Sequence, residues 1–296
     1  MPGPIDRLRA DPVIRTAHDA LRDGLPGADL RSLLLDVASE RAANRPPSAV
    51  LEQYRTDRFC TPSPVDAVAI ATAEAAALQA VSSTFRAIQL SPVSPLATSS
   101  SMSQVPQNNV VTTMRLTEVL SDPTNMLALE AALERRVDTT TTVRLAAKHR
   151  VLRAQRFEGP RSFAHFSLLG MVSAGRDQGD RGFEVAELIR HIQSLVAAVI
   201  AIDAVAEVVV QVSDHSGRFD EAQVVVDALD VEATVDPDRT HGRGYYEHLC
   251  FKIGVRRDDE IVEVGDGGST SWTQHLFADR KERLVISGSG LDRIVM

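Results

Sequence analysis

The sequence DPDRTHGRGYY spans Asp236 to Tyr246, and it is followed by the strand-like LCFKI (249–253), the glycine turn GDGG (265–268) and the closing stretch VISGSGLDR (285–293). The closing stretch has the pattern of a short apolar strand, two glycines that let a ligand or another backbone come near, and a helix start that carries Arg293. The guanidinium of such an arginine can stack on a purine or pair with a phosphate. These features of the last fifth of the chain indicate a nucleotide site, whereas the closing stretch taken alone is also typical of a structural strand-to-helix turn.

A β-hairpin is predicted farther upstream, in the stretch from Val151 to Gly175. Apolar and polar residues alternate there on both sides of a Gly-Pro pair at 159–160, which is typical of two strands joined by a turn. Arg153 lies in the first of these strands. Taken alone, an arginine at such a position is a solvated strand residue, so its functional interpretation depends on the other motifs.

A helix start is predicted at Asp122-Pro123-Thr124. The Asp122 side chain can accept a hydrogen bond from the first turn, and proline suits the first helical position. Strands are expected at 110–120 and 206–212 and a long helix at 183–202, whereas the polar stretch 96–108 lacks periodicity and is expected to be a mobile loop. From the residues alone, these patterns predict a mixed α/β domain with many strands.

Two domains are expected, divided at Pro62-Ser63-Pro64. Residues 1–64 carry apolar residues at helical spacing and predict a small helical appendage, and residues 65–296 form the main domain. The main domain opens with an Ala-rich helix at 65–87 that leads into a strand ending near Pro92. Because proline cannot donate a backbone hydrogen bond, this strand is expected at an edge of the sheet.

Composition and charge narrow the function classes. The chain has 296 residues, of which 44% are hydrophobic and 24% charged, with a net charge of −8 and a pI near 5.5, so it has no global attraction to nucleic acid. Its two cysteines lack metal-ligand spacing, and we identify neither an apolar run of membrane-spanning length nor the pattern of a signal peptide. We therefore expect a cytoplasmic protein without a membrane partner.

The order of these motifs resembles the catalytic core of class II aminoacyl-tRNA synthetases, in particular the histidyl branch. That core ends with a DPxxxRGxxYY run, a strand that contains Phe, a Gly-Gly turn and a closing GxGxxR, and the first run aligns with 236–246 without a gap. The resemblance covers roughly residues 65–293. It implies an α/β fold of the α+β type, with a mostly antiparallel sheet of six or seven strands flanked by helices, and a homodimer whose interface includes Pro92.

The resemblance also implies roles for individual residues. ATP, with Mg²⁺ bridging its phosphates, would be held by Arg153, Glu158, Gly288, Gly290 and Arg293. The acid to be activated would lie against Asp122, Thr124, Tyr245 and Tyr246. In the family, the arginine at the place of Arg153 contacts the α-phosphate.

Three departures from the family pattern bear on the chemistry. His241 replaces an arginine that the family keeps beside the reacting carboxylate; because histidine can donate a hydrogen bond and carry charge near neutral pH, we count it with Arg153 and Arg293 as a candidate catalytic residue, an ordinary polar role being the alternative. Leu168 and Val172 replace the polar pair that reads the amino acid. An apolar wall leaves a buried ammonium unpaired at a cost of roughly several kcal/mol, so histidine bound in the usual way is not expected.

Two hypotheses from different function classes follow. In the first, the protein is an ATP-dependent ligase that activates an amino acid or another small carboxylic acid as an acyl-adenylate and passes it to an acceptor other than cognate tRNA. In the second, it is a non-catalytic binding protein, similar to the regulatory subunit of ATP phosphoribosyltransferase, with a protein partner. The sequence stops three residues after Arg293, so we expect no anticodon-binding domain, disfavour a true histidyl-tRNA synthetase and leave tRNA binding open.

Overall fold

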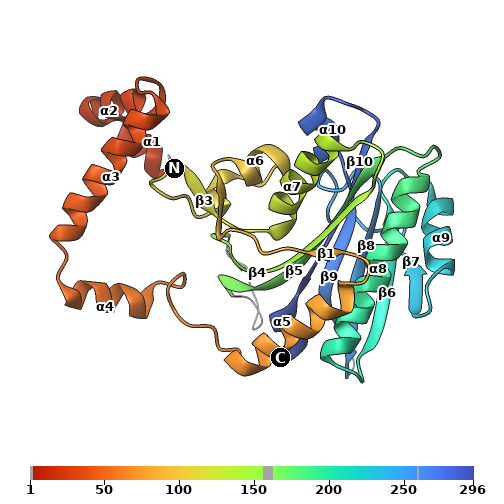
Figure 1. Ribbon diagram of the computed structural model, residues 1–296. Coiled ribbons are helices and arrows are strands. Elements are labelled where there is room, and N and C mark those ends of the chain that lie inside the picture. The colour runs from red at the N-terminus through yellow and green to blue at the C-terminus, as the bar shows by residue number, and fades with distance from the viewer. Residues whose placement is uncertain (1–2, 156–162, 259) are drawn as a thin grey trace.

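A large twisted sheet forms the centre of the protein in the computed structural model, which describes residues 3–155, 163–258 and 260–296 (Figure 1). Within this part of the chain the sheet has eight strands. In spatial order they are β1 (Arg86–Ala87), β4 (Val143–Leu152), β5 (His165–Arg176), β10 (Glu282–Gly290), β9 (Glu260–Thr270), β8 (Leu249–Arg257), β6 (Glu207–Asp214) and β7 (Glu232–Val235).

Neighbouring strands of the sheet are antiparallel except at the two edges, where β1 pairs with β4 and β7 pairs with β6 in parallel. The predicted mostly antiparallel sheet is therefore confirmed, with eight strands in place of six or seven. The predicted hairpin corresponds to β4 and β5, and Arg153 follows the last residue of β4. The strand expected before Pro92 is only the two-residue β1, which does lie at an edge.

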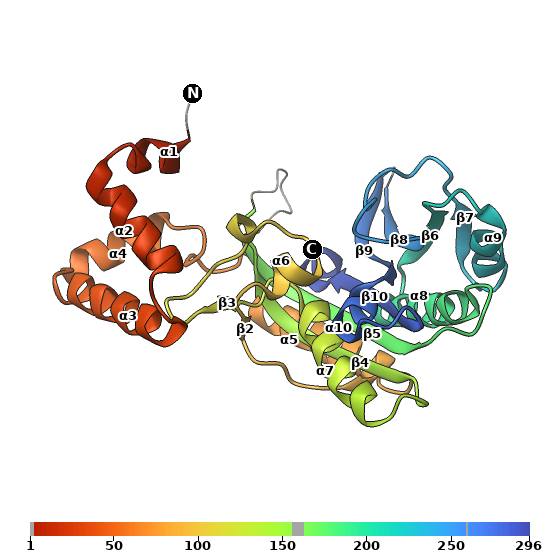
Figure 2. The ribbon, with the colours of Figure 1, turned by 90° about the horizontal axis from the view of Figure 1, so that it is seen from above.

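Helices cover both faces of the sheet (Figure 2). One face packs against α5 (Ala67–Val81), α8 (Gly182–Ile202), α9 (Phe219–Asp227) and α11 (Leu291–Val295). The other face packs against α7 (Pro123–Val137) and α10 (Trp272–Phe277). Apolar residues on alternate positions of the central strands fill the two cores, as the period of two in a strand requires. The helix predicted at 183–202 is confirmed as α8.

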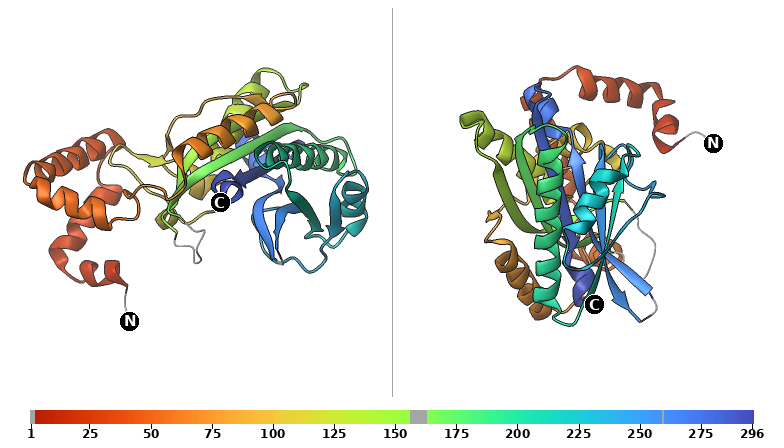
Figure 3. Two further views of the ribbon diagram at one scale, coloured as in Figure 1. Left: turned by 90° about the horizontal axis from the view of Figure 1, so that it is seen from below. Right: turned by 90° about the vertical axis from the view of Figure 1, so that its right-hand side faces the viewer.

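By length and composition α8 could span a membrane, so the statement that no apolar run reaches that length was wrong. It is the one such helix among the described residues. Its apolar residues Leu188, Ile192 and Leu195 are fully buried in the core, and the helix lies along the sheet beside α5 (Figure 3). This is the position of a core helix, whose apolar length serves packing.

The N-terminal helices lie to one side of the sheet (Figures 1 and 3). They are α1 (Pro4–Arg9), α2 (Pro12–Asp23), α3 (Gly27–Ala43) and α4 (Pro47–Thr56), and none of them contains a buried residue. The segment after α4 contacts the main body: the Thr61 carbonyl oxygen lies 2.7 Å from Nε2 of His165. The helical nature of residues 1–64 is confirmed, and the domain boundary at residue 64 stays a prediction.

The polar stretch 96–108 is more ordered than expected. It contains α6 (Thr98–Met102) and the 3-10 helix η1 (Gln107–Asn109), beside a small sheet of β2 (Val93–Pro95) and β3 (Thr117–Val119). The completely buried Glu118 accepts hydrogen bonds from the backbone N–H groups of Ala97 and Ser99 and from the Gln107 amide. These long-range hydrogen bonds order the segment although its sequence lacks periodicity. The strand expected at 110–120 is reduced to β3.

The GDGG sequence is not a turn, because residues 265–268 lie inside β9, paired with β8 and β10. Close approach explains the glycines. A Cβ at Gly267 would lie 2.6 Å from the Ile286 carbonyl oxygen, and one at Gly268 would lie 2.6 Å from the Tyr246 ring. A side chain fits at neither position, so these glycines allow close packing within the sheet.

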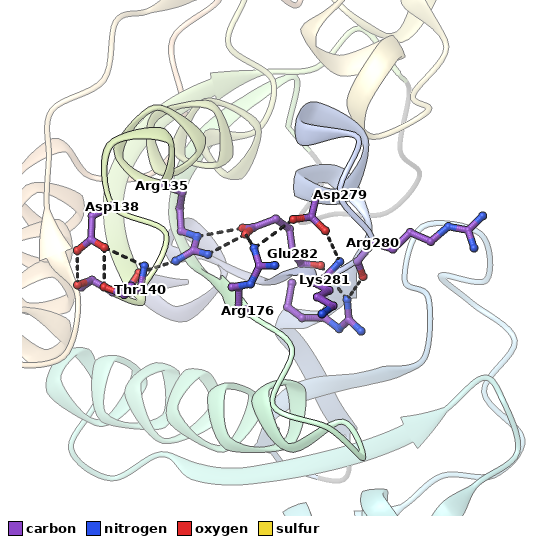
Figure 4. Close-up of polar contacts among 10 residues, drawn as sticks. Arg135, Asp138, Thr140, Arg176, Asp279, Arg280, Lys281 and Glu282 are labelled. Carbon is purple, nitrogen blue, oxygen red and sulfur yellow. Dashed lines mark hydrogen bonds and ion pairs between the residues drawn. The ribbon is translucent and has the colours of Figure 1, made fainter.

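A buried ion pair joins α7 to β10 (Figure 4). The Arg135 guanidinium donates to both carboxylate oxygens of Glu282, at 2.9 and 2.8 Å, and to the Thr141 carbonyl at 2.7 Å. Only 1% of the Arg135 side chain and 3% of the Glu282 side chain are exposed. Arg176, which lies 3.3 Å from Glu282, also contacts Asp279 at the surface. The pair fixes the C-terminal end of α7 against the sheet.

Replacement of Arg135 by methionine is expected to lower the free energy of unfolding by about 3–5 kcal/mol, because Glu282 is left buried without its main partner. The double variant Arg135→Met/Glu282→Leu should lose less than the two single variants together, since no unpaired charge remains. Urea denaturation of all four proteins measures this difference. Additive losses would show that the two side chains are not coupled.

The opposite face of the sheet holds a buried histidine. His191 of α8 is completely buried, with Nε2 3.0 Å from the Ser173 hydroxyl and Nδ1 2.7 Å from the Ser287 hydroxyl. The Phe85 ring packs edge-on at 4.8 Å. Burial lowers the pKa of His191 from 6.5 to about 3, so the imidazole is neutral in the folded protein.

His191 is expected to make the protein acid-sensitive. Its neutral form adds stability that is fully present above pH 6.5 and is lost as the pH falls toward 3, because the unfolded chain then binds a proton that the folded chain does not. The slope is at most about 1.4 kcal/mol per pH unit. His191→Gln should reduce this slope between pH 6.5 and pH 4 in denaturation experiments, whereas His275→Gln, at an exposed position, should retain it. Equal slopes would contradict the assignment.

Candidate functional site

A cavity of about 780 Å³ lies on the face of the sheet that α7 covers, above β8, β9 and β10. Nine of the ten sequence-predicted site residues line it: Asp122, Thr124, Arg153, His241, Tyr245, Tyr246, Gly288, Gly290 and Arg293. The tenth, Glu158, lies outside the described residues. Motifs that are far apart in the sequence therefore surround one cavity.

The start of α7 forms one wall. As predicted, Asp122 caps this helix: its Oδ1 accepts the Thr124 backbone N–H at 3.0 Å and the Thr124 hydroxyl at 2.7 Å. Arg153 donates through Nε to the Ser121 carbonyl at 3.0 Å and through Nη2 to Oδ2 of Asp122 at 3.4 Å. Its guanidinium lies 5.2 Å from the centre of the Phe166 ring. These contacts fix a half-buried cation beside the cavity.

A glycine on β5 brings this wall close to the sheet. A Cβ at Gly170 would lie 2.6 Å from Cγ of Pro123, the first residue of α7. On the same strand Leu168 lines the cavity, whereas Val172 is completely buried in the core and does not. The expected apolar wall is therefore made by Leu168 without Val172.

Two tyrosines form the adjoining wall. Gly242 and Gly244 have φ values of 87° and 84°, and they turn the chain so that the Tyr246 N–H reaches the Gly242 carbonyl at 2.9 Å. The Tyr245 ring packs edge-on against Tyr246 at 4.9 Å and against Trp272 at 5.7 Å. Burial raises the pKa of both tyrosines well above 10, so their hydroxyls stay protonated and can donate hydrogen bonds.

Asp266 and Arg239 were not predicted from the sequence. Asp266 lines the cavity from β9, and its Oδ2 accepts the Tyr246 hydroxyl at 2.9 Å. Arg239 lies behind it, with Nη2 3.9 Å from Asp266, Nε donating to the His241 carbonyl at 3.0 Å, and 2% of its side chain exposed. The His241 side chain is exposed at the cavity. In the sequence, Asp266 could have been noticed as a charged residue between two glycines. No sequence pattern marked Arg239 as a site residue.

The other end of the cavity holds Arg293, from α11. Its Nη1 donates to the Glu263 carbonyl at 3.1 Å, and the Glu263 carboxylate pairs with Lys252 at 3.0 Å. Asp292 is 2% exposed, and its Oδ2 accepts the Ser167 N–H at 2.6 Å, while Oδ1 has no hydrogen-bond partner among the described residues. Burial raises the pKa of Asp292. Lys252, one of three lysines in the chain, could have been found from its place in an apolar strand.

These groups fit a nucleotide with a divalent cation. Arg153, Lys252 and Arg293 offer positive charge for phosphates at the cavity, and the carboxylates of Glu263 and Asp292 lie among them. The described residues contain no cluster of three or more His, Cys, Asp or Glu side chains that could hold a metal alone. Mg²⁺ bound through phosphates needs only one or two carboxylates, which the cavity has.

No family model matches the chain. Histidine–tRNA ligase of Oceanobacillus iheyensis is 30% identical over 80 residues, which cover 26% of this chain and 19% of that protein. The match thus spans about a fifth of the relative's length.

Two solved structures share most of the fold. An ATP phosphoribosyltransferase regulatory subunit/histidyl-tRNA synthetase from Bacillus halodurans has a TM-score of 0.61 at 13% identity, covering 80% of this chain and 83% of that chain. Histidyl-tRNA synthetase of S. aureus has a TM-score of 0.60 at 11% identity, covering 79% and 68%. The chain therefore has the class II aminoacyl-tRNA synthetase-like fold, as predicted.

Proposed function

We propose that the protein uses ATP to activate an amino acid or another small carboxylic acid as an acyl-adenylate, which it passes to an acceptor other than cognate tRNA. One observation carries this proposal: Arg153 and Arg293, from distant parts of the chain, line one cavity together with the capped end of α7. The cavity volume of about 780 Å³ lies within the usual range for small-molecule sites.

In this reaction a carboxylate oxygen of the acid attacks the α-phosphorus of ATP, an O–P bond forms, and pyrophosphate leaves. Negative charge grows on the α-phosphate during attack, and Arg153 stabilises it from a position that its bonds to Ser121 and Asp122 already fix. Arg293 pairs with the outer phosphates or stacks on the purine. The carboxylates of Glu263 and Asp292 would help to hold Mg²⁺, which would neutralise part of the phosphate charge.

The acid lies at the end of the cavity that Thr124, Tyr245 and Tyr246 line. His241, at the same end, donates a hydrogen bond to the reacting carboxylate. We further propose that the protein acts as a cytoplasmic homodimer with its interface at α5 and β1, because β1 is the edge strand on that side of the sheet.

A second candidate function is that of a non-catalytic regulatory or binding protein with a protein partner. The apolar Leu168 at the cavity supports it, because this side chain offers no acceptor to an amino acid. The ATP phosphoribosyltransferase regulatory subunit/histidyl-tRNA synthetase from Bacillus halodurans has the same fold.

Pyrophosphate exchange into ATP, with Mg²⁺ and a panel of the twenty amino acids and small carboxylic acids, separates the two functions. Exchange that depends on one acid is the result expected for the ligase. Absence of exchange with every acid, together with measurable ATP or histidine binding in calorimetry, would favour the regulatory function.

Replacement of Arg293 by alanine is expected to weaken ATP binding at least about tenfold, because a charge-assisted contact to the nucleotide is lost. Stability should change little, since the Arg293 side chain is exposed. Calorimetric titration with Mg·ATP measures the loss. Arg280→Ala, which removes an exposed arginine away from the cavity, is the control and should bind like wild type. Unaltered ATP affinity in folded Arg293→Ala would contradict the proposed nucleotide site.

A further inference from the structure

Asp266 stands on an open part of the sheet. It lies opposite Lys252 of β8 and Gly288 of β10, with Gly265 and Gly267 on either side along β9. On the same face of the sheet, Gly288 directly opposite and Gly268 two residues along β9 have no side chains to cover it, and 39% of the Asp266 side chain is exposed at the cavity. A ligand on this face of the sheet can therefore contact the carboxylate directly.

The carboxylate of Asp266 has unused acceptor capacity. An ionised carboxylate has about four lone-pair sites for hydrogen bonds. Among the described residues the Tyr246 hydroxyl is its one hydrogen-bond donor, at 2.9 Å. Arg239 is 3.9 Å away, which is too far for a hydrogen bond. Burial raises the pKa of Asp266, and the hydrogen bond from Tyr246 and the positive charge of Arg239, buried behind it, oppose this rise.

Asp122, the other carboxylate at this end, has fewer free acceptor sites. Its Oδ1 accepts both the backbone N–H and the hydroxyl of Thr124, and its Oδ2 pairs with Arg153. The side chain of Leu168, which also lines the cavity, has no hydrogen-bond acceptor. An N–H donor placed at this end of the cavity therefore finds its free charged acceptor on β9.

We propose that Asp266 determines substrate specificity by accepting hydrogen bonds from a protonated amine, so that the activated acid is an amino acid and not an unsubstituted carboxylic acid. This proposal rests on the proposed function for the nature of the site and adds the class of substrate. It places amine recognition on a residue of β9 and not on Asp122, which the resemblance also placed against the acid. Arg239 acts as a positioning residue, since it holds the charge of Asp266 without contacting the ligand.

Matched pairs of acids test the proposal: each amino acid is compared with the acid of the same carbon skeleton in which hydrogen replaces the amine. Calorimetric titration of the full chain, with and without Mg·ATP, gives both affinities. Wild type is expected to bind the amine-bearing member of at least one pair about tenfold more tightly or better, because hydrogen bonds to a charged group are strong. Asp266→Asn should bring this ratio close to one.

Two further variants keep the test decisive. Asp230→Asn makes the same charge change at an exposed position and should retain the wild-type ratio. Tyr246→Phe removes only the hydroxyl that donates to Asp266, and it should lower the ratio partly even if Asp266→Asn fails to fold. An unchanged ratio in folded Asp266→Asn, equal binding of both members of every pair by wild type, or binding of neither member would overturn the proposal.

Pyrophosphate exchange with the same pairs separates this proposal from the proposed function. Exchange with the deaminated acids as rapid as with the amino acids would overturn amine recognition and leave adenylation standing. Amine-selective binding without any exchange would support Asp266 as the amine acceptor and count against the ligase.

Discussion

The close approach of backbones at the glycines of β9 and β10 decides where the cavity lies. A Cβ at Gly268 would meet the Tyr246 ring, and one at Gly265 would lie 2.7 Å from the Gly288 carbonyl oxygen. Gly268 and Gly288 lie on the same face as Asp266, and because they carry no side chains the sheet has an open floor there, while residues of the opposite face stay packed against α8. Tyr246 can lie against that floor and donate to Asp266. The proposed substrate end depends on these glycines.

The helix α7 supplies the opposite wall, and both of its ends are tied to other parts of the structure. At its start the Asp122 cap also binds Arg153, so one carboxylate serves helix formation and the placement of a cation. At its other end the buried Arg135–Glu282 pair holds the helix to β10. Structural capping and a functional position were alternative interpretations of Asp122 in the sequence. Its place in the structure satisfies both, because the cavity begins at the helix start.

Local patterns predicted much of this structure, and long-range packing accounts for what they missed. The Asp122 cap, the hairpin of β4 and β5, and the strand and helix start around Gly288 and Gly290 have their signals in neighbouring residues, and all were confirmed. The prediction of a turn at GDGG was wrong, because glycine occurs both in turns and where two backbones approach each other closely. Glu118 orders residues 96–108 through contacts that no periodicity shows. Arg239 and Asp266 belong to the site only because β9 lies beside the 241–246 turn.

Co-crystallisation with Mg²⁺ and a non-hydrolysable ATP analogue tests most directly whether the α7 face of the sheet is a nucleotide site. We expect the triphosphate between Arg153 and Arg293, with the α-phosphate at the Arg153 guanidinium and the end of the cavity beside Asp266 free for the acid. A nucleotide bound elsewhere on the chain, or an empty cavity at saturating nucleotide, would contradict this assignment.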